Sequence, residues 1–477
     1  MNKFLLFFLS ILYPLVSVST ESQPEGVLPQ HTVFIDNIHA HNFLNAELTP
    51  DSTNYNALFG LSDITNYLKR QGIRVVTPKK GLINSRRLED VDTLLINRVS
   101  DDLPVLRIEE VAAIKDFVEK GGKLFLVLDQ ANIYHHAHRL EGLLTEFGIN
   151  TYFGTAMDAK PNIIGERPDW LAVDRLALHH LMENLDVLAM ASSAVVHSQY
   201  SLAALSKESW SDVPVANSKK GLSGHLNHFG NRTKDAGEKA EYISVISLVE
   251  FGEGHVVLIG DQNMLGNLGL RLEDNYKFML NLFAWTSQNN KLKDYKQFIT
   301  NNKASIVLLD DITQSSFIND SKWGFYNAYT VLAKSYNTFV RSSLDDYPYD
   351  LVIVSQNPPE WLPEHTDRLK ALLMAGKNIA FLSLKKELSE KSKIIFADVT
   401  EGLKIDKEET IDNQRIIHYQ SAGNVVFLNG IQKYNNQRIE APTKTPDMDY
   451  KDREDEWLER VGNLIIKKDD VSEVSGL

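Results

Sequence analysis

Cysteine is absent from this chain of 477 residues. This absence excludes disulfide bonds, thiolate metal sites, iron–sulfur clusters and every cysteine nucleophile. Basic residues are also scarce, with 50 Lys and Arg against 63 Asp and Glu, which leaves a formal net charge of −13. Nucleic acids and anionic lipid surfaces are bound mainly through basic side chains, so neither is an expected partner.

Long apolar runs are missing as well, except close to the N-terminus. Residues 4–16 are nearly all apolar, follow a basic start at Lys3 and precede the small residues 18–20. This layout is typical of a secretory signal peptide, and a run of about 13 residues is short for a bilayer span. We predict a signal peptide over residues 1–19 and an exported protein, periplasmic or secreted, with no stable membrane insertion after cleavage. An uncleaved anchor is the alternative.

The rest of the composition is ordinary, with 43 % hydrophobic and 24 % charged residues. These proportions are typical of globular proteins, and at roughly 150 residues per domain the length suggests about three domains or two large ones. Short apolar runs alternate with amphipathic patterns over residues 31–150, which predicts a mainly parallel sheet with helices on both faces. The predicted strands are 32–36, 73–77, 92–97 and 123–128, and the predicted helices are 61–71 and 108–120.

The same order of elements recurs in the second part of the chain. Strands are predicted at 306–310, 350–354 and 378–382, and the pattern of 423–430 corresponds to that of 254–261. We therefore predict an α/β protein with two doubly wound domains in tandem, although any two α/β domains share such features. The predicted organisation is domain 1 over 31–287 with an insertion at about 150–240, a linker over 288–303, domain 2 over 304–466, and a flexible tail over 467–477.

Several motifs carry a resemblance to a known family. They are a strand ending in Asp36, the Asp-x-Leu-Leu-Ile pattern of residues 92–96, a helix followed by Gly121-Gly122 and a strand, and the closing segment 250–263. This arrangement resembles the class I glutamine amidotransferase-like, flavodoxin-like fold. It is similar to exported bacterial proteins that carry such a domain of unknown function, a type also found in gliding-motility and ABC-transport auxiliary proteins.

The resemblance also bears on activity. Catalytic members of that family place a cysteine on a sharp turn after a strand, with a histidine partner downstream. The matching turn here is 128–131, which has no cysteine. The resemblance therefore implies the fold without amidotransferase chemistry, and any activity has to come from other residues.

Polar residues end several of the predicted strands of domain 1, where ligands bind in doubly wound sheets. Asp36, Asp129 and Asp261 each end a strand, and Asn97 and Arg98 end another. We expect these strand ends to meet at one rim. The candidate catalytic residues are Asp36, His39, Asp129 and Asp261, and the candidate ligand-binding residues are His41, Asn42, Asn97, Arg98, Asn263 and Asn267.

Asp36, His39 and His41 are candidate ligands of a divalent metal, because carboxylate and imidazole groups bind such ions. No other cofactor is expected, and no metal-binding spacing such as His-Glu-x-x-His is present. Alternatively, the histidines are polar loop residues, and Asp129 and Asp261 cap the helices that follow them. Histidines 135, 136 and 138 fit a solvated helix start, whereas Trp170, Trp210 and Trp323 fit either core packing or stacking on a sugar.

Two functions remain open at this point. The first is a non-catalytic exported binding or scaffolding protein of the bacterial cell envelope that recognises a protein partner or a glycan. The second is a metal- or water-dependent hydrolase that acts on carbohydrate or amide substrates at the strand ends of domain 1. The second domain keeps Asp310 but has Gly430 where the first has an acid. We therefore expect the site in domain 1.

Overall fold

The computed structural model describes most of the chain outside its two ends. The described residues are 31–40, 46–49, 52, 54–97, 99, 104–131, 133, 136–150, 152–165, 167–213, 230–294, 298, 303–319, 325–383, 388–411, 414–420, 422–429, 434, 455 and 457–465. The predicted signal peptide and tail, and the candidates His41, Asn42 and Arg98, lie outside these residues. Within them, no helix combines the length and the apolar character needed to cross a bilayer.

The first half of the chain builds an eight-stranded sheet in the order β2-β1-β3-β4-β14-β13-β11-β8. The strands from β2 to β14 are parallel, and those from β13 onward are antiparallel. Their bounds are β1 Thr32–Ile35, β2 Arg74–Val76, β3 Thr93–Asn97, β4 Lys123–Val127, β8 Arg175–Leu176, β11 Tyr200–Ala204, β13 Ser244–Phe251 and β14 Gly254–Ile259.

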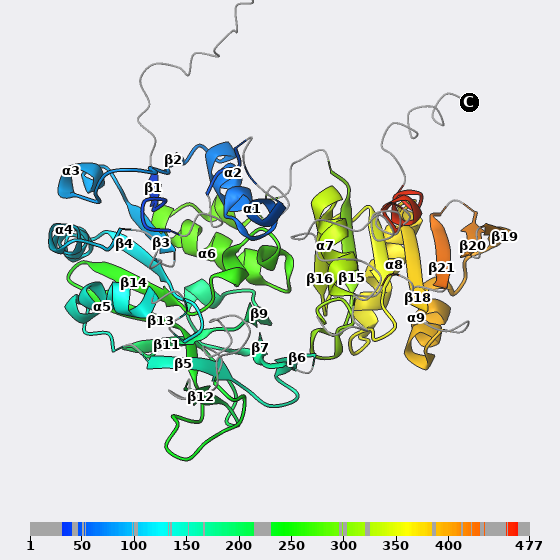
Figure 1. Ribbon diagram of the computed structural model, residues 1–477. Helices are drawn as coiled ribbons and strands as arrows, with labels where there is room; N and C mark the ends of the chain where they lie inside the picture. The colour runs from blue at the N-terminus through cyan, green and yellow to red at the C-terminus, as the bar shows by residue number, and fades with distance from the viewer. Residues whose placement is uncertain are drawn as a thin grey trace, which may run out of the picture.

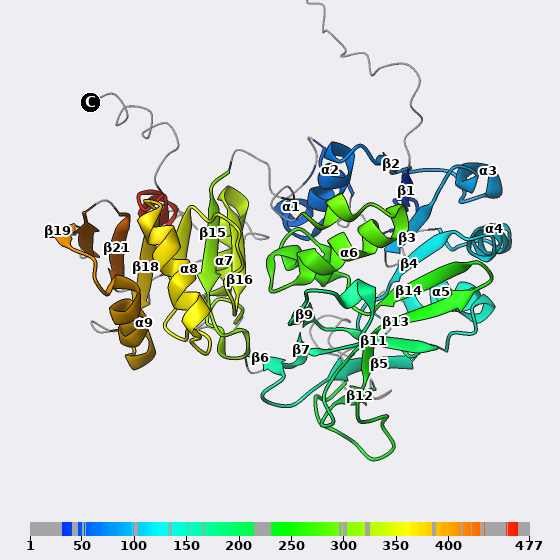
Figure 2. The same ribbon diagram turned by 180° about the vertical axis from the view of Figure 1, so that it is seen from behind.

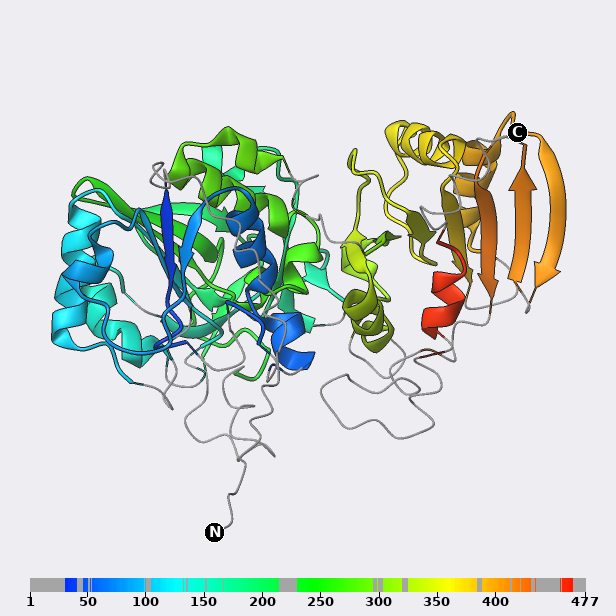
Figure 3. The same cartoon turned by 90° about the horizontal axis from the view of Figure 1, so that it is seen from above.

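Helices cover both faces of this sheet because successive strand residues point to opposite sides. Val33 and Ile35 belong to the core that includes α2 (Ser62–Arg70) and α6 (Asn275–Ser287). Phe34 belongs to the core under α4 (Ile108–Glu119) and α5 (His136–Glu146). Figure 3 shows the two helix layers on opposite sides of the strands. The short helices α1 (Asn54–Phe59) and α3 (Ser85–Leu88) complete this half.

The predicted insertion is built of short strands. It forms two three-stranded sheets, β10-β5-β12 and β6-β7-β9, and it also supplies β8 and β11 to the main sheet. In Figures 1 and 2 the β6–β7 segment reaches from the first half towards the second. The bounds are β5 Tyr152–Met157, β6 Ile163–Ile164, β7 Arg167–Val173, β9 Leu188–Ala191, β10 Ala194–Val195 and β12 Trp210–Asp212.

The second half forms a seven-stranded sheet in the order β16-β15-β17-β18-β21-β20-β19. Its first five strands are parallel and follow the same order as β2-β1-β3-β4-β14 of the first sheet. The α/β prediction is thus confirmed. The elements are β15 Ser305–Leu309, α7 Tyr326–Ser335, β16 Asn337–Arg341, β17 Leu351–Val354, α8 Pro363–Met374, β18 Asn378–Ser383, α9 Glu390–Thr400, β19 Ile405–Ile411, β20 Gln414–Tyr419 and β21 Asn424–Asn429, and residues 457–462 are helical.

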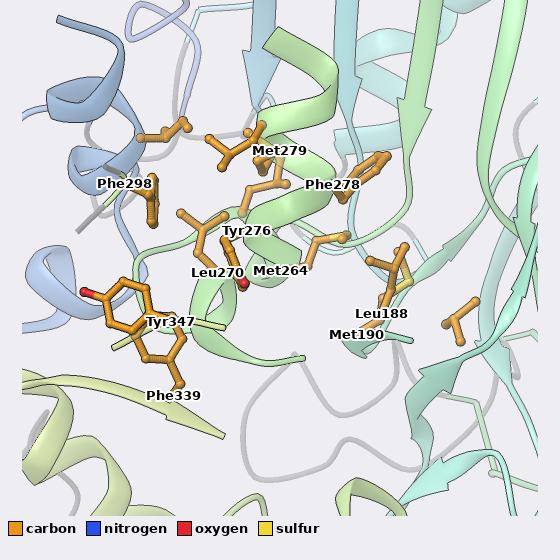
Figure 4. Packing of buried hydrophobic residues seen from close by; sticks show 14 of the residues in the cluster. Leu188, Met190, Met264, Leu270, Tyr276, Phe278, Met279, Phe298, Phe339 and Tyr347 are labelled. Atoms are coloured by element: carbon orange, nitrogen blue, oxygen red, sulfur yellow. The ribbon is translucent and has the colours of Figure 1, made fainter. Parts of the chain in front are cut away.

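One apolar core continues from the first half into the second. The ring of Tyr276 lies 5.9 Å from Phe339 of β16, and Phe298 contacts both Tyr67 and Tyr276 (Figure 4). Phe298 lies in the predicted linker, and Leu292 of the same segment is fully buried. Two residues of the predicted linker, Leu292 and Phe298, therefore belong to this core.

A buried polar joint adds to this contact. Arg341 is 1 % exposed, and its guanidinium lies 2.8 Å from Asp274 and 2.9 Å from Asp345. Glu273 accepts hydrogen bonds from the backbone N–H and the hydroxyl of Ser342. Because a buried charge needs a partner, these contacts tie the start of α6 to the end of β16.

Candidate functional site

A cavity of about 290 Å³ opens at the carboxyl ends of β4 and β14. Its walls come from the first sheet, from the small sheet β6-β7-β9, from the 3-10 helices Asn263–Leu265 and Gly269–Arg271, and from the second half. Ligand sites in open α/β sheets are expected at this edge. The described lining residues are Phe59, Asp129, Gln130, Ile133, Ile164, Trp170, Ala189, Met190, Ala191, Ser192, Asp261, Gln262, Asn263, Met264, Leu268, Gly269, Leu272, Ile318 and Tyr326.

Asp129 enters the cavity from the turn between β4 and α5. The backbone N–H of Leu128 donates to the carbonyl oxygen of Ile259 at 2.8 Å, which keeps the ends of β4 and β14 side by side. Oδ1 of Asp129 accepts from the N–H of Gln130 at 2.9 Å. Ala131 follows with a φ of +45°, a left-handed conformation that is costly for a residue with a side chain. The sharp turn expected at 128–131 is therefore present.

His136 holds this turn from the first residue of α5. Its Nε2 accepts from the N–H of Asp129 at 3.2 Å, and its Nδ1 lies 2.8 Å from the carbonyl oxygen of Ile133. The imidazole is fully buried. The interpretation of this residue as part of a solvated helix start is therefore wrong, because the turn needs a buried acceptor for the Asp129 N–H.

Asp261 faces the cavity from the end of β14 and is fully buried. Its Oδ2 accepts from the N–H of Ala191 at 2.6 Å, and its Oδ1 accepts from the N–H of Asn263 at 2.7 Å. Burial, and then the nearby charge of Asp129, raise the pKa of Asp261 to about 8. The cavity thus contains a carboxyl group that is mainly protonated at neutral pH. The bond to Ala191 also shows that Asp261 does more than cap the following 3-10 helix.

One wall of the cavity is aromatic and comes from both halves of the chain. The ring of Trp170 on β7 lies 5.9 Å from that of Tyr326 at the start of α7. Arg167 stacks over Trp170 at 4.5 Å, and its guanidinium also pairs with the buried Asp169 at 2.6 Å. Trp170 therefore lines the cavity, where it is partly buried.

Polar groups of the insertion complete the wall next to Asp129. Ser192 has a φ of +71°, and its hydroxyl donates to Asp169 at 2.9 Å. With its amide nitrogen as the donor, Gln130 lies 3.0 Å from the carbonyl oxygen of Ser192. The strained serine and this bond bring the β9–β10 turn against the end of β4.

Asp36 and His39 lie in a different buried cluster, together with Glu110. Nδ1 of His39 lies 2.9 Å from Asp36, and its Nε2 lies 3.6 Å from Glu110. Burial opposes the charged imidazole, but the hydrogen bonds and charges of the two acids prevail and raise the pKa of His39. Glu110 also accepts from the backbone N–H of Arg107 and of Ile83, so the cluster holds the start of α4.

These acids are therefore divided between two places. Asp129 and Asp261 line the cavity, whereas Asp36 and His39 are not among its described lining residues. In the part of the chain that the structure describes, no group of three His, Asp or Glu side chains is arranged to hold a metal ion. Asp36 and His39 bond to each other instead, and the third candidate ligand, His41, lies outside that part.

The three candidate asparagines that the structure describes have three different environments. Asn263 lines the cavity, as expected of a ligand-binding residue. Asn267 is not among the described lining residues. Its amide accepts from the N–H of Asp63 at 2.8 Å and donates to the carbonyl oxygen of Ala57 in α1 and to Ser62 at the start of α2. Asn97 is 1 % exposed, and neither polar atom of its amide has a hydrogen-bond partner among the described residues. Only Asn263 therefore belongs to the cavity.

Several lining residues were not predicted from the sequence as candidates for a functional site. Gln130, Ser192, Ile318 and Tyr326 were not among the candidates, and they come from four separate segments. Ser192 and Tyr326 reach the cavity only because the insertion and the second half pack against the first sheet. A polar residue after a predicted strand could have pointed to Gln130, as it did to Asp129.

Residues 56–283 match a family model described as Domain of unknown function (DUF4350). The match spans the region in which a domain of unknown function was expected, and it includes most of the cavity. No curated protein matches the chain.

Several solved structures show distant similarity. The mmIFT52 N-terminal domain is 13 % identical, with 54 % of this chain and 97 % of that chain covered and a TM-score of 0.38. A putative thua-like protein from Bacteroides uniformis is 12 % identical, with 55 % and 95 % covered and a TM-score of 0.32. A beta-galactosidase from Rahnella sp. R3 is 13 % identical, with 55 % and 31 % covered and a TM-score of 0.30. At these TM-scores we infer nothing further from them.

Proposed function

We propose that this chain is a non-catalytic, exported binding protein of the bacterial cell envelope that holds a sugar unit of a glycan in the cavity between its two halves. The observation that carries the proposal is the cavity itself, in which strand-end polar groups face an aromatic wall. Ligand sites are typically concave and mostly apolar, with a few polar groups that orient the ligand. The export signal expected at residues 1–19 supports the location.

The lining favours a glycan over a protein partner. Trp170 and Tyr326 offer aromatic rings for contact with the apolar face of a sugar, and Asp129, Asp261 and Asn263 offer acceptors and donors for its hydroxyls. A protein partner would need a broad exposed surface, whereas these groups line one cavity of about 290 Å³. The shared strand order of the two sheets further supports the interpretation as tandem amidotransferase-like domains that have lost the nucleophile.

Calorimetric titration of the mature protein with a panel of monosaccharides and short envelope glycans tests the proposal. Trp170→Ala should weaken binding about fivefold or more, since stacking on a ring contributes about 1 kcal/mol or more. Trp361→Ala is the matched control, because Trp361 lies in the second half and is not a described lining residue. If no sugar binds, or if both variants bind like the parent, the proposal is wrong.

One observation favours the hydrolase alternative. Asp129 and Asp261 lie in one cavity, and the raised pKa of Asp261 would suit a general acid beside an ionised carboxylate. We propose this as the second candidate function, on carbohydrate or amide substrates. Release of product from chromogenic glycosides or amides, abolished in Asp261→Asn, would replace the binding function with this one. Binding without turnover would keep the first proposal.

A further inference from the structure

The cavity combines acidic groups with an aromatic wall. The described lining residues include two carboxylic acids, Asp129 and Asp261, and no Lys, Arg or His. The nearby cation of Arg167 is not a described lining residue; it stacks on Trp170 at 4.5 Å and pairs with Asp169 at 2.6 Å. An anionic ligand would therefore meet like charge in a region of low dielectric constant, whereas a cationic ligand would meet opposite charge.

Three aromatic residues surround the same space from different parts of the chain. Phe59 comes from α1, Trp170 from β7 and Tyr326 from α7. Aromatic ring faces attract ammonium groups, and the attraction is larger where water is excluded. Aromatic and acidic groups around one cavity thus favour a ligand that is positively charged and partly apolar.

Asp261 is the acid best placed to meet such a charge. Its two oxygens accept hydrogen bonds from the backbone N–H groups of Ala191 and Asn263, and no cation bonds to it among the described residues. A carboxylate oxygen can accept more than one hydrogen bond, so an ammonium group in the cavity can bond to Asp261 without displacing either N–H.

We propose that the ligand of this cavity carries a protonated amine that binds Asp261, so that the site selects an amino sugar over a neutral sugar. This inference rests on the proposed function and specifies the ligand class. Asp129 and the aromatic wall then orient the remainder of the sugar ring.

The proposal predicts that binding of the ligand releases the carboxyl proton of Asp261. In the empty cavity, burial and the charge of Asp129 raise the pKa of Asp261 to about 8, so this carboxyl group is mainly protonated below that pH. An ammonium group beside it favours the ionised form and lowers the pKa. The carboxyl proton is then transferred to the buffer, while the ammonium group keeps its own protons. Binding below the raised pKa should therefore release up to about one proton per ligand.

The experiment uses D-glucosamine and D-glucose as probes of nearly equal shape, titrated into the full mature chain at about pH 6.5, below the raised pKa. Calorimetry in two buffers with different ionisation enthalpies counts the protons released. We expect glucosamine to bind at least about tenfold more tightly than glucose, with proton release for glucosamine alone. This comparison needs no variant and therefore does not depend on whether a variant folds.

Two variants then test whether Asp261 causes the preference for glucosamine and the proton release. Asp261→Asn should abolish both the preference for glucosamine and the proton release. Asp310→Asn is the matched control, because Asp310 is equally buried and follows β15 in the second sheet, but it is not a described lining residue of the cavity. It should retain both properties, and far-ultraviolet circular dichroism checks the folding of each variant.

The outcomes separate this inference from the proposed function. If glucose binds as well as glucosamine, or if no proton is released, the amine proposal is wrong while the sugar-binding function stands. If the proton release persists in Asp261→Asn, the assignment to Asp261 is wrong. If neither these probes nor the wider glycan panel binds, the proposed function fails, and this inference fails with it.

Discussion

The two large sheets have the same order of parallel strands, yet the acids that follow these strands have different surroundings in the two sheets. In the first sheet Asp129 and Asp261 line a cavity. In the second, Asp310 follows β15 and is fully buried, and it accepts from the hydroxyls of Ser315 and Ser355 and from the N–H groups of Ser316 and Phe317. The acid of the second sheet is therefore occupied by its own neighbours.

This comparison shows that a strand-end acid does not make a site by itself. The first sheet has an additional small sheet, β6-β7-β9, whose Trp170 and Ala191 form one side of the cavity. The second half supplies the opposite wall through Ile318 and Tyr326. A cavity therefore forms where three units meet, in agreement with the rule that fold alone does not specify function.

The largest expected effect concerns the joint between the two regions. Arg341→Met should lower the free energy of unfolding by about 3–5 kcal/mol, because it leaves the buried carboxylates of Asp274 and Asp345 without their cation. Denaturation with guanidinium chloride measures the change. Arg415→Met, which removes an exposed pair with Glu408 on the second sheet, should have little effect. Equal effects of the two variants would contradict a buried joint.

The buried acids of both sheets predict a shared pH dependence. Burial raises the pKa of Asp261 to about 8 and that of Asp310 to about 7, above the value of about 3.9 for an unfolded aspartate. Since the folded state then holds more protons, the free energy of unfolding should fall as the pH rises from about 4 to about 8. Denaturation at several pH values should show a shallower fall in Asp261→Asn and in Asp310→Asn. An unchanged slope in both variants would contradict the raised pKa values.

Two asparagines of one loop allow structure and binding to be separated. Asn267→Ala should cost about 1–3 kcal/mol of stability, because it leaves the backbone groups of Asp63 and Ala57 without a partner. Asn263→Ala should instead weaken sugar binding, since Asn263 lines the cavity. Thermal unfolding and calorimetric titration of both variants measure the two effects. Weaker binding in Asn267→Ala at unchanged stability would reverse the assignment.

The smallest expected effect tests the contribution of the second half. Tyr326→Ala should weaken sugar binding by about 0.5–1.5 kcal/mol, because Tyr326 forms part of the aromatic wall with Trp170. Tyr200→Ala is the control, since Tyr200 is 51 % exposed on β11 and is not a described lining residue. Unchanged affinity in Tyr326→Ala would mean that the first half binds the ligand alone.

Much of the fold could be predicted because the central parallel strands are short apolar runs. The predicted strand 92–97 corresponds to β3, Thr93–Asn97, and the predicted helix 108–120 corresponds to α4, Ile108–Glu119. The strand β19 was not predicted, because an exposed edge strand such as Ile405–Ile411 carries charged residues and lacks a continuous apolar run. The strands of the insertion were not assigned either, and several of them are very short, such as the two residues of β10, Ala194–Val195.

The candidate site could be predicted only in part. Asp129, Asp261 and Asn263 follow strands that the apolar pattern identifies, and all three line the cavity. The same logic placed Asp36 with them, but His39 and Glu110 hold Asp36 in a cluster of their own. A pattern along the chain shows that a residue follows a strand, but it does not show which side chains surround that residue.

The sequence by itself determined the α/β class, the repeated strand pattern and the absence of a thiol nucleophile, because periodicity and composition are local properties of a chain. Only the tertiary structure decided which acids share a cavity, that the rings of Trp170 and Tyr326 lie 5.9 Å apart, and that Asp310 is enclosed by serines. The first two features join segments more than a hundred residues apart and the third joins Asp310 to Ser355, 45 residues further along the chain. Burial and charge at such contacts arise only when the segments pack together.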